Sequence, residues 1–243
     1  MPRLFVVPRP EMDMTEASLD FLGPVDFTKA IAPQVHRKLR NAIIRNFLVP
    51  GRRVSEAGVA EALKVSRQPV RETFILLAEQ GMLDIRPKSG SSVPQISISK
   101  VVQIQAIREA IEADVARAAA RLMTKPQIDA LYRQLEHQND AQARAASDFM
   151  ELDDLFHKTL AQGADLPFAW NVIEMQKAQL DRVRFLALSK EPSKGIPAQH
   201  FAIVEAIAAH NPERAEMEMR AHLRDVLRDL PVIARKYSDY FKE

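Results

Sequence analysis

Apolar residues between positions 31 and 47 recur at steps of three and four, and charged residues occupy most of the positions between them. This spacing places the apolar side chains on one face, so it predicts an amphipathic helix over residues 31–47. Pro50 and Gly51 follow and are typical of the turn that ends such a helix. The apolar positions are Ile31, Val35, Leu39, Ala42, Ile43 and Phe47.

Two shorter helices are expected after this turn. Ser55 is a suitable N-cap for a helix over residues 56–63, and Ser66 is a suitable N-cap for a helix over residues 67–80. Gly81 stands directly after the second helix, where glycine commonly ends a helix.

The segment LDIRPKSGSSV predicts a small β-hairpin, with one strand at 83–85, a turn that contains Gly90 and a second strand near Val93. The order helix, helix, turn, helix and hairpin is that of a winged helix-turn-helix, which we expect over residues 31–95. Residues 1–30 carry four of the fifteen prolines and no sustained helical period, so we expect a loosely ordered arm there. Late in this segment, Phe21, Leu22 and Phe27 are expected to dock the arm on the rest of the chain.

The rest of the chain shows only helical patterns. Thr124 and Gln127 have the spacing of a capping box, and no alternating β-pattern of useful length follows Ile98. We therefore expect an all-helical bundle over residues 99–238 and a mostly α fold for the chain. Besides the helix with an apolar stripe from Val101 to Val115, helices are expected over residues 126–145, 148–162, 167–189, 197–209 and 212–235.

The composition narrows the function classes. The chain has 243 residues, enough for two modest domains, and no apolar stretch reaches the roughly 18 residues of a membrane span, so we expect no membrane partner. The absence of cysteine excludes disulfides, thiolate zinc sites and cysteine nucleophiles, and it agrees with a cytoplasmic location. With only seven glycines, the sequence contains no glycine-rich phosphate-binding loop.

The formal net charge of +2 conceals an uneven distribution along the chain. Residues 31–98 hold 11 lysines and arginines against 5 aspartates and glutamates, a net charge of +6. Residues 1–30 and residues 99–243 each carry a net charge of −2. A basic helix-turn-helix is the electrostatic feature expected of a protein that contacts the phosphates of double-stranded DNA.

The helix expected over residues 67–80 has the features of a DNA-reading helix. Arg67, Gln68 and Arg71 project from its N-terminal end, where a recognition helix contacts base edges. Arginine can bind guanine in a bidentate manner, and glutamine can bind adenine in the same way. The alternative is that a basic helix end is simply a solvated surface, but the element order and the charge of +6 favour DNA binding.

Two neighbouring features would add contacts to the DNA backbone. Ser66 and the N–H groups of the first helical turn can bind a phosphate oxygen, helped by the helix dipole. The tip of the hairpin, which includes Lys88 and Gly90, would act as a wing near the minor groove or the backbone.

The stretch HRKLRNAIIRNFLVPGRRVSEAGVAEALKVSRQPVRETFILLAEQGMLDIRPKSGSSV closely resembles the winged helix-turn-helix domain of GntR-family bacterial transcription regulators. The most specific matches are "VSRQPVRE", the preceding "PG" turn and the "SG" of the wing. Two positions depart from the family pattern. Ala57 stands where an arginine is usual, which would remove one DNA contact, and Lys64 stands where a glycine is common, which would add a phosphate contact. The resemblance implies operator contacts by Ser66, Arg67, Gln68, Arg71 and Gly90.

Three histidines and one aspartate form a candidate metal site. Asp153 and His157 lie four residues apart and so share one face of a predicted helix. His200 and His222 lie on later helices whose apolar neighbours indicate packing in the same bundle, where facing helices commonly build metal sites. Three imidazoles and a carboxylate suit zinc, nickel or another first-row divalent ion. The alternative is that each is an ordinary hydrogen-bonded core histidine, because sequence spacing alone does not join them.

Residues 99–238 resemble the FCD domain, the all-helical effector-binding domain of the FadR subfamily, through "IREAIEADVARAAA", "LDDLFHKTL" and "QHFAIVEAIAAHNPERAEMEMRAHL". The resemblance implies that Arg108 helps to bind an acidic effector, since a guanidinium binds a carboxylate at two points. The alternative for Arg108 is a surface ion pair with Glu112. The resemblance also implies a divalent metal, zinc before other ions, held by Asp153, His157, His200 and His222.

Together these features predict a homodimeric transcription regulator that places two recognition helices on a near-palindromic operator. The family resemblance implies that it is a repressor, although the sequence features themselves do not give the sense of regulation. A small organic-acid effector, held by the metal and Arg108, would change the placement of the winged domains. We expect no enzymatic activity and assign no catalytic residue. Two alternatives stay open: a metal-dependent hydrolase that uses the Asp and three His, and a DNA-binding protein whose helical domain only dimerises.

Overall fold

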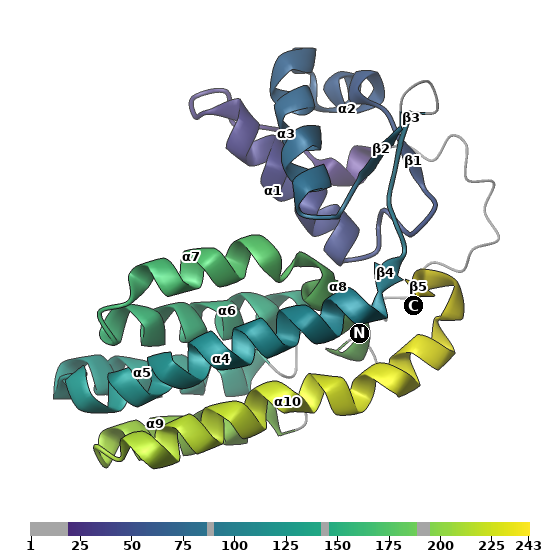
Figure 1. Cartoon of the computed structure of the whole chain (residues 1–243). Coiled ribbons are helices and arrows are strands. Elements are labelled where there is room, and N and C mark those ends of the chain that lie inside the picture. The colour runs from purple at the N-terminus through teal and green to yellow at the C-terminus, as the bar shows by residue number, and fades with distance from the viewer. Residues whose placement is uncertain (1–18, 87–89, 142–145, 189–194) are drawn as a thin grey trace. The chain divides into compact units, whose positions relative to one another are not determined.

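The helix-turn-helix expected from the sequence is present in the computed structural model of the chain (Figure 1). The chain divides into two units. The N-terminal unit ends at Ser97 and also includes Tyr237–Glu243, and the helical unit is Ile98–Lys236. The structure describes residues 19–86, 90–141, 146–188 and 195–243.

The helices of the N-terminal unit pack through their apolar faces, so that Val35 and Phe74 have no exposed surface. The first helix ends three residues earlier than predicted. Asn46 adopts the left-handed conformation, with φ +58°, and the N–H of Phe47 bonds the carbonyl of Ala42, which closes the helix. The three helices are α1 (Ile31–Ile44), α2 (Glu56–Leu63) and α3 (Arg67–Glu79).

The wing is an antiparallel sheet in which β3 (Gly90–Ser92) lies between β1 (Arg53–Val54) and β2 (Asp84–Arg86). The predicted hairpin of β2 and β3 is confirmed. The sequence does not reveal β1, because a strand of two residues is too short to show an alternating pattern.

The late part of the arm docks through Phe21 and Leu22, as expected, whereas Phe27 is exposed. The 3₁₀ turn η1 (Asp20–Leu22) buries Leu22 and stacks the ring of Phe21 on Phe47, with 5.4 Å between ring centroids. The side chain of Gln34 bonds both the backbone N–H and the carbonyl of Asp26, each at 2.8 Å. Residues 1–18 lie outside the described part of the chain.

The helical unit confirms the mostly α fold. In it α4 and α10 lie side by side (Figure 1). The predicted capping box is also present, because the side-chain oxygen of Gln127 accepts a hydrogen bond from the N–H of Thr124 at 2.8 Å. None of the described helices is long and apolar enough to cross a membrane. The helices are α4 (Ile98–Leu122), α5 (Lys125–Ala141), α6 (Ala146–Gly163), α7 (Pro167–Gln176), α8 (Ala178–Leu188), α9 (Ile196–Ala208) and α10 (Pro212–Lys236).

The single helix predicted over residues 167–189 is wrong, because α7 and α8 are separated at Lys177. The Nζ of Lys177 is buried and bonds Asp154 at 2.7 Å and Asp181 at 2.9 Å. These bonds hold a charged side chain inside the bundle at the point where the helix is interrupted. Residue 189 lies outside the described residues.

The end of the chain contains a strand that the helical pattern does not predict. After the 3₁₀ turn η2 (Ser238–Tyr240), β5 (Phe241–Lys242) pairs in parallel with β4 (Ile96–Ser97). The expectation of no β-structure after Ile98 is therefore wrong. This strand is two residues long and its partner is distant in sequence, so no local pattern marks it.

Candidate functional site

The N-terminal end of α3 is the candidate DNA-reading surface. Ser66, Arg67, Gln68 and Arg71 are all exposed there, while Val70 is fully buried and anchors the helix. Ser66 occupies the N-cap position with an extended backbone, but its hydroxyl makes no capping hydrogen bond. Ser66 is thus the N-cap residue that the sequence predicts, and its hydroxyl is left on the surface where a phosphate oxygen can reach it.

The two departures from the expected helix-turn-helix pattern, Ala57 and Lys64, are both exposed on α2 and its end. Lys64 closes α2 in the left-handed conformation, with φ +54°, and its N–H bonds the carbonyl of Glu61 at 3.1 Å. Glycine adopts this conformation without steric cost, which is the physical reason that it suits this turn. Lys64 keeps the turn and places a positive charge just before α3.

The wing tip is described only in part. Gly90 is exposed and begins β3 with φ +81°, a conformation that favours glycine. Arg86 pairs with Gly90 across the hairpin and forms an ion pair with Asp84 at 2.8 Å. Lys88, the other predicted wing contact, lies outside the described residues.

The four candidate metal ligands meet inside the helical unit. One ligand atom of each of Asp153 and His157 on α6, His200 on α9 and His222 on α10 lies within 4.8 Å of all the others. The Nε2 of His222 is 3.3 Å from Nε2 of His200 and 3.3 Å from Nε2 of His157. The Nε2 of His200 is 3.5 Å from Oδ1 of Asp153. The tertiary structure thus joins residues that sequence spacing left apart.

The second ring nitrogen of each histidine faces a hydrogen-bond acceptor from another part of the bundle. These acceptors have no sequence signal beyond being polar residues on predicted helices, and they were not foreseen. They are Oε1 of Gln138, 2.7 Å from Nδ1 of His200; Oε1 of Gln199, 2.9 Å from Nδ1 of His222; and the Glu112 carboxylate, which contacts Nδ1 of His157.

The orientation of the two carboxamides determines where the imidazole protons lie. The Nε2 of Gln138 donates to the carbonyl of Leu152 at 3.2 Å, and the Nε2 of Gln199 donates to Asp225. Each Oε1 must therefore accept from its histidine, so the proton is on Nδ1 and the lone pair of Nε2 points inward. Two inward lone pairs and a carboxylate repel one another unless a cation lies among them, and Nε2 of His157 lies 3.3 Å from Nε2 of His222, so these residues fit a divalent metal ion.

The electrostatics of the cluster also suit a metal ion. Burial lowers the pKa of His200 to about 3 although Asp153 opposes the shift, and burial together with the other two imidazoles lowers the pKa of His222 well below its usual value. Burial raises the pKa of Asp153, but Arg184 and the histidines outweigh burial and hold this pKa well below its usual range. Neutral imidazoles and an ionised carboxylate are the protonation states that metal binding requires.

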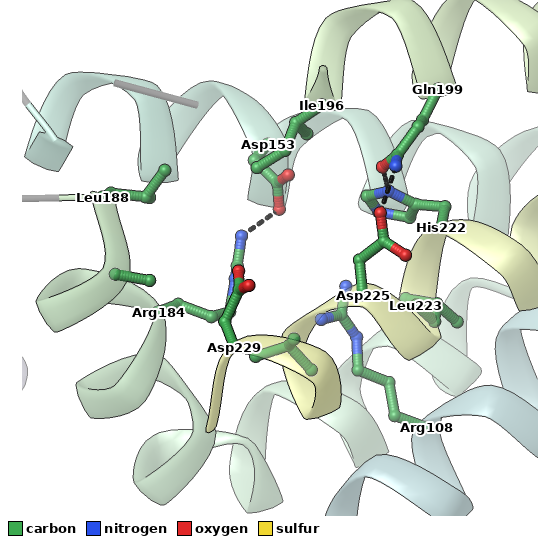
Figure 2. Close-up of a pocket in the computed structure, with 12 residues that line it drawn as sticks. Arg108, Asp153, Arg184, Leu188, Ile196, Gln199, His222, Leu223, Asp225 and Asp229 are labelled. Carbon is green, nitrogen blue, oxygen red and sulfur yellow. Dashed lines mark hydrogen bonds and ion pairs between the residues drawn. The ribbon is translucent and has the colours of Figure 1, made fainter. Parts of the chain in front are cut away.

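A cavity of about 180 Å³ lies beside the cluster (Figure 2). Arg108, on α4, lines this cavity and forms its expected ion pair with Glu112, but both side chains are buried rather than at the surface. The Nη2 of Arg108 is also buried and has no hydrogen-bond partner among the described residues. The cavity is lined by Arg108, Asp153, Arg184, Ala187, Leu188, Ile196, Gln199, His222, Leu223, Asp225, Val226 and Asp229.

Arg184 is a second cavity arginine, which no sequence pattern marks. It contacts Asp153 directly and lies 3.3 Å from Asp181 and 3.4 Å from Asp154. Burial lowers the pKa of Arg184, but these three carboxylates outweigh burial and raise it. Arg184 is therefore neutralised largely by protein groups, whereas Nη2 of Arg108 has no hydrogen-bond partner within the described residues.

Comparisons with known proteins match both units. Residues 31–93 match the family described as bacterial regulatory proteins, gntR family, and residues 103–225 match the FCD domain. Over 218 residues the chain is 39% identical to the HTH-type transcriptional repressor RspR of Escherichia coli (strain K12), covering 89% of this chain and 96% of that protein. It is 32% identical over 208 residues to an uncharacterized HTH-type transcriptional regulator of Streptomyces ambofaciens, and the match covers 85% of this chain and 88% of that protein. Among solved structures, E. coli McbR/YncC has a similar fold, with a TM-score of 0.71, 20% identity, and coverage of 86% of this chain and 99% of that one.

Proposed function

This chain belongs to the GntR family of bacterial regulatory proteins and carries an FCD domain, and we propose that it is a repressor controlled by a small carboxylate bound beside a divalent metal ion. Its relatives are transcriptional regulators, so the chain is a regulator and not the metal-dependent hydrolase that the Asp and His cluster alone would permit. The name of the E. coli relative, a transcriptional repressor, supports repression as the sense of regulation.

The observation that carries the proposal is the free Nη2 of Arg108 in the cavity beside the histidine cluster. A buried guanidinium nitrogen without an acceptor is unfavourable, typically by about 1–3 kcal/mol, and a ligand carboxylate would satisfy it. Since this nitrogen belongs to a residue that lines the cavity, an anion bound there can accept a hydrogen bond from it.

The metal ion would be held by Asp153, His157, His200 and His222, with zinc or nickel suited to this ligand set. When bound, the ion would supply positive charge and an open coordination position to a carboxylate. That charge matters because the described lining contains three aspartates, Asp153, Asp225 and Asp229, against two arginines. Without the ion the cavity is formally negative and repels an acid; with a divalent ion it becomes positive.

DNA binding would use two copies of the chain. One N-terminal unit presents one recognition helix, α3, and reads one half-site, so a homodimer is needed to place two such helices on a near-palindromic operator. The effector regulates binding only if it favours one arrangement of the two N-terminal units over the other.

Metal analysis and a ligand screen test the proposal directly. The protein purified without chelators should contain zinc or nickel, and small organic acids should raise its thermal midpoint only when the metal is present. At 100 times its dissociation constant a ligand stabilises by about 2.7 kcal/mol, which a thermal shift detects. A metal-free protein that no acid stabilises would instead favour a helical unit that serves only dimerisation.

A further inference from the structure

The α10 side of the cavity carries a row of acidic side chains (Figure 2). Besides His222, the lining residues on α10 include Asp225 and Asp229, so the cavity follows this helix for two turns. Seven residues of helix span about 10 Å. A ligand whose carboxylate lies at the metal and Arg108 would have Asp225 beside it and Asp229 one helical turn further along the cavity.

These two aspartates differ in their surroundings. Asp225 accepts from the Nε2 of Gln199 and pairs with Arg228, so its charge is partly neutralised. Asp229 is exposed, and it has no ion-pair partner within the described residues. A second carboxylate on the ligand would meet like charge at both positions, whereas a hydroxyl group can donate a hydrogen bond to either carboxylate.

The volume of the cavity restricts the length of the ligand. A cavity of about 150 Å³ can hold benzene, and this cavity measures about 180 Å³. A ligand of roughly six to ten non-hydrogen atoms fits, which corresponds to an acid of three or four carbons with its oxygens.

We propose that Asp225 and Asp229 are specificity-determining residues that restrict the effector to short monocarboxylates bearing hydroxyl groups and exclude dicarboxylates of the same length. This inference rests on the proposed function of the cavity. Arg228 beside Asp225 disfavours an added cation, so hydroxyl groups are favoured over an ammonium group as the donors.

Four acids of equal chain length test this specificity in the zinc-loaded full chain: threonate, butyrate, succinate and 4-aminobutyrate. Isothermal titration should give threonate an affinity at least tenfold higher than each of the other three. Asp229→Asn should raise the affinity for succinate at least threefold, because it removes a like charge without changing shape. Glu213→Gln, which removes one charge from the exposed start of α10, is the matched control. It should leave the affinities for threonate and for succinate unchanged.

The outcomes separate this inference from the proposed function. If succinate or 4-aminobutyrate binds as tightly as threonate and Asp229→Asn changes nothing, the specificity is wrong while the effector site stands. If zinc is bound but none of the four acids binds, both the effector role and the specificity fail. Asp225→Asn with unchanged zinc content provides a second variant, since its amide oxygen can still accept from Gln199.

A second inference rests on the pairing of β4 with β5. The chain passes from the N-terminal unit to the helical unit after Ser97 and returns after Lys236. β4 leads directly into α4, which carries Arg108, and β5 follows α10, which carries His222. The helix that carries Arg108 and one of the three helices that carry metal ligands therefore adjoin the same strand pair.

The contacts of this strand pair are well defined. Ile96 pairs with Phe241 and both are buried, and the Nε2 of Gln95 donates to the carbonyl of Asp239 at 3.0 Å. The chain therefore connects the two units twice, before α4 and after α10. We infer that residues 237–243 transmit the state of the cavity to the N-terminal unit, an inference that again rests on regulated DNA binding.

The test compares the full chain with a chain that ends at Lys236 and with Phe241→Ala. The probes are zinc, whichever of the four acids most stabilises the zinc-loaded full chain, and a duplex selected by the full chain from random DNA. Zinc and acid affinities should be unchanged in both variants, while the acid-dependent change in duplex affinity should fall at least threefold. Val232→Ala, at an exposed position of α10, is the control.

If both variants keep the full acid-dependent change in duplex affinity, the proposed role of residues 237–243 is refuted. If the shortened chain no longer binds zinc, its helical unit has been damaged and Phe241→Ala alone decides. If the acid binds the full chain but leaves its duplex affinity unchanged, regulated binding itself fails.

Discussion

The carboxamide oxygen of Gln138 lies 2.7 Å from Nδ1 of His200 and determines which nitrogen of that ring faces the metal cluster. Since the Nε2 of Gln138 is committed to the carbonyl of Leu152, the amide cannot turn and offer a donor instead. The ring is thereby held in the orientation and tautomer that a metal ligand requires.

Replacing this acceptor should weaken metal binding. Gln138→Met removes the hydrogen bond while filling a similar volume, and we expect the zinc affinity to fall about 10–100-fold, as is typical when a partner of a metal-binding histidine is lost. Competition with a chromophoric chelator measures the change. Gln134→Met is the control, because Gln134 on the same helix bonds Thr159 and not a histidine; an equal loss there would show a general packing effect.

Stability without metal should depend on pH in a defined direction. Burial lowers the pKa of His200 from 6.5 to about 3, so below pH 6.5 the unfolded chain takes up a proton that the folded chain refuses. The free energy of unfolding of the chelated protein should therefore fall as the pH decreases from 6.5 toward 3, by about 1.4 kcal/mol per unit for this histidine. His200→Gln should flatten the slope between pH 6.5 and 5; an unchanged slope in urea titrations contradicts the assignment.

Lys64 should affect stability and DNA binding in opposite directions. Lys64→Gly removes a side chain from a left-handed position, so we expect a gain of about 0.5–1 kcal/mol in the stability of the N-terminal unit. The same change removes a positive charge near α3 and should reduce the salt dependence of DNA binding by about one unit of log–log slope. Lys64→Asn, which also tolerates this conformation, separates the charge from the backbone effect.

Lys177 should be important for the stability of the helical unit. Its buried ammonium lies between Asp154 and Asp181, and its removal leaves Asp181 buried beside fewer positive charges. We expect Lys177→Met to destabilise the protein by about 3–5 kcal/mol. Lys158→Met on the exposed face of α6 is the matched control and should change stability by less than about 0.5 kcal/mol in thermal unfolding.

Arg67 and Arg71 should contribute to DNA affinity without contributing to the fold. Both side chains are exposed at the start of α3, so Arg67→Ala or Arg71→Ala should weaken operator binding by about 1–3 kcal/mol and leave the thermal midpoint unchanged. Fluorescence anisotropy with a labelled duplex measures the affinity. Unchanged binding by both variants would remove these arginines from the DNA-reading surface.

The sequence by itself determined the element order, the basic helix-turn-helix and the identity of the four candidate metal ligands. Periodicity and capping residues act over three or four positions, so the starts of α2, α5 and α10 follow from local patterns. The same locality explains the errors. The break at Lys177 depends on two carboxylates, one of them on another helix, and β5 depends on a partner strand near the middle of the chain.

Only the tertiary structure decided how the candidate site is organised. Whether three histidines are core residues or a cluster depends on distances between helices, and the protonated nitrogen of each depends on Gln138, Gln199 and Glu112, whose sequence positions carry no signal. The same holds for Arg108: spacing predicts its pairing with Glu112, but burial and the free Nη2 arise from packing against α10. Local patterns fix which residues can act, and packing fixes which of their atoms face one another.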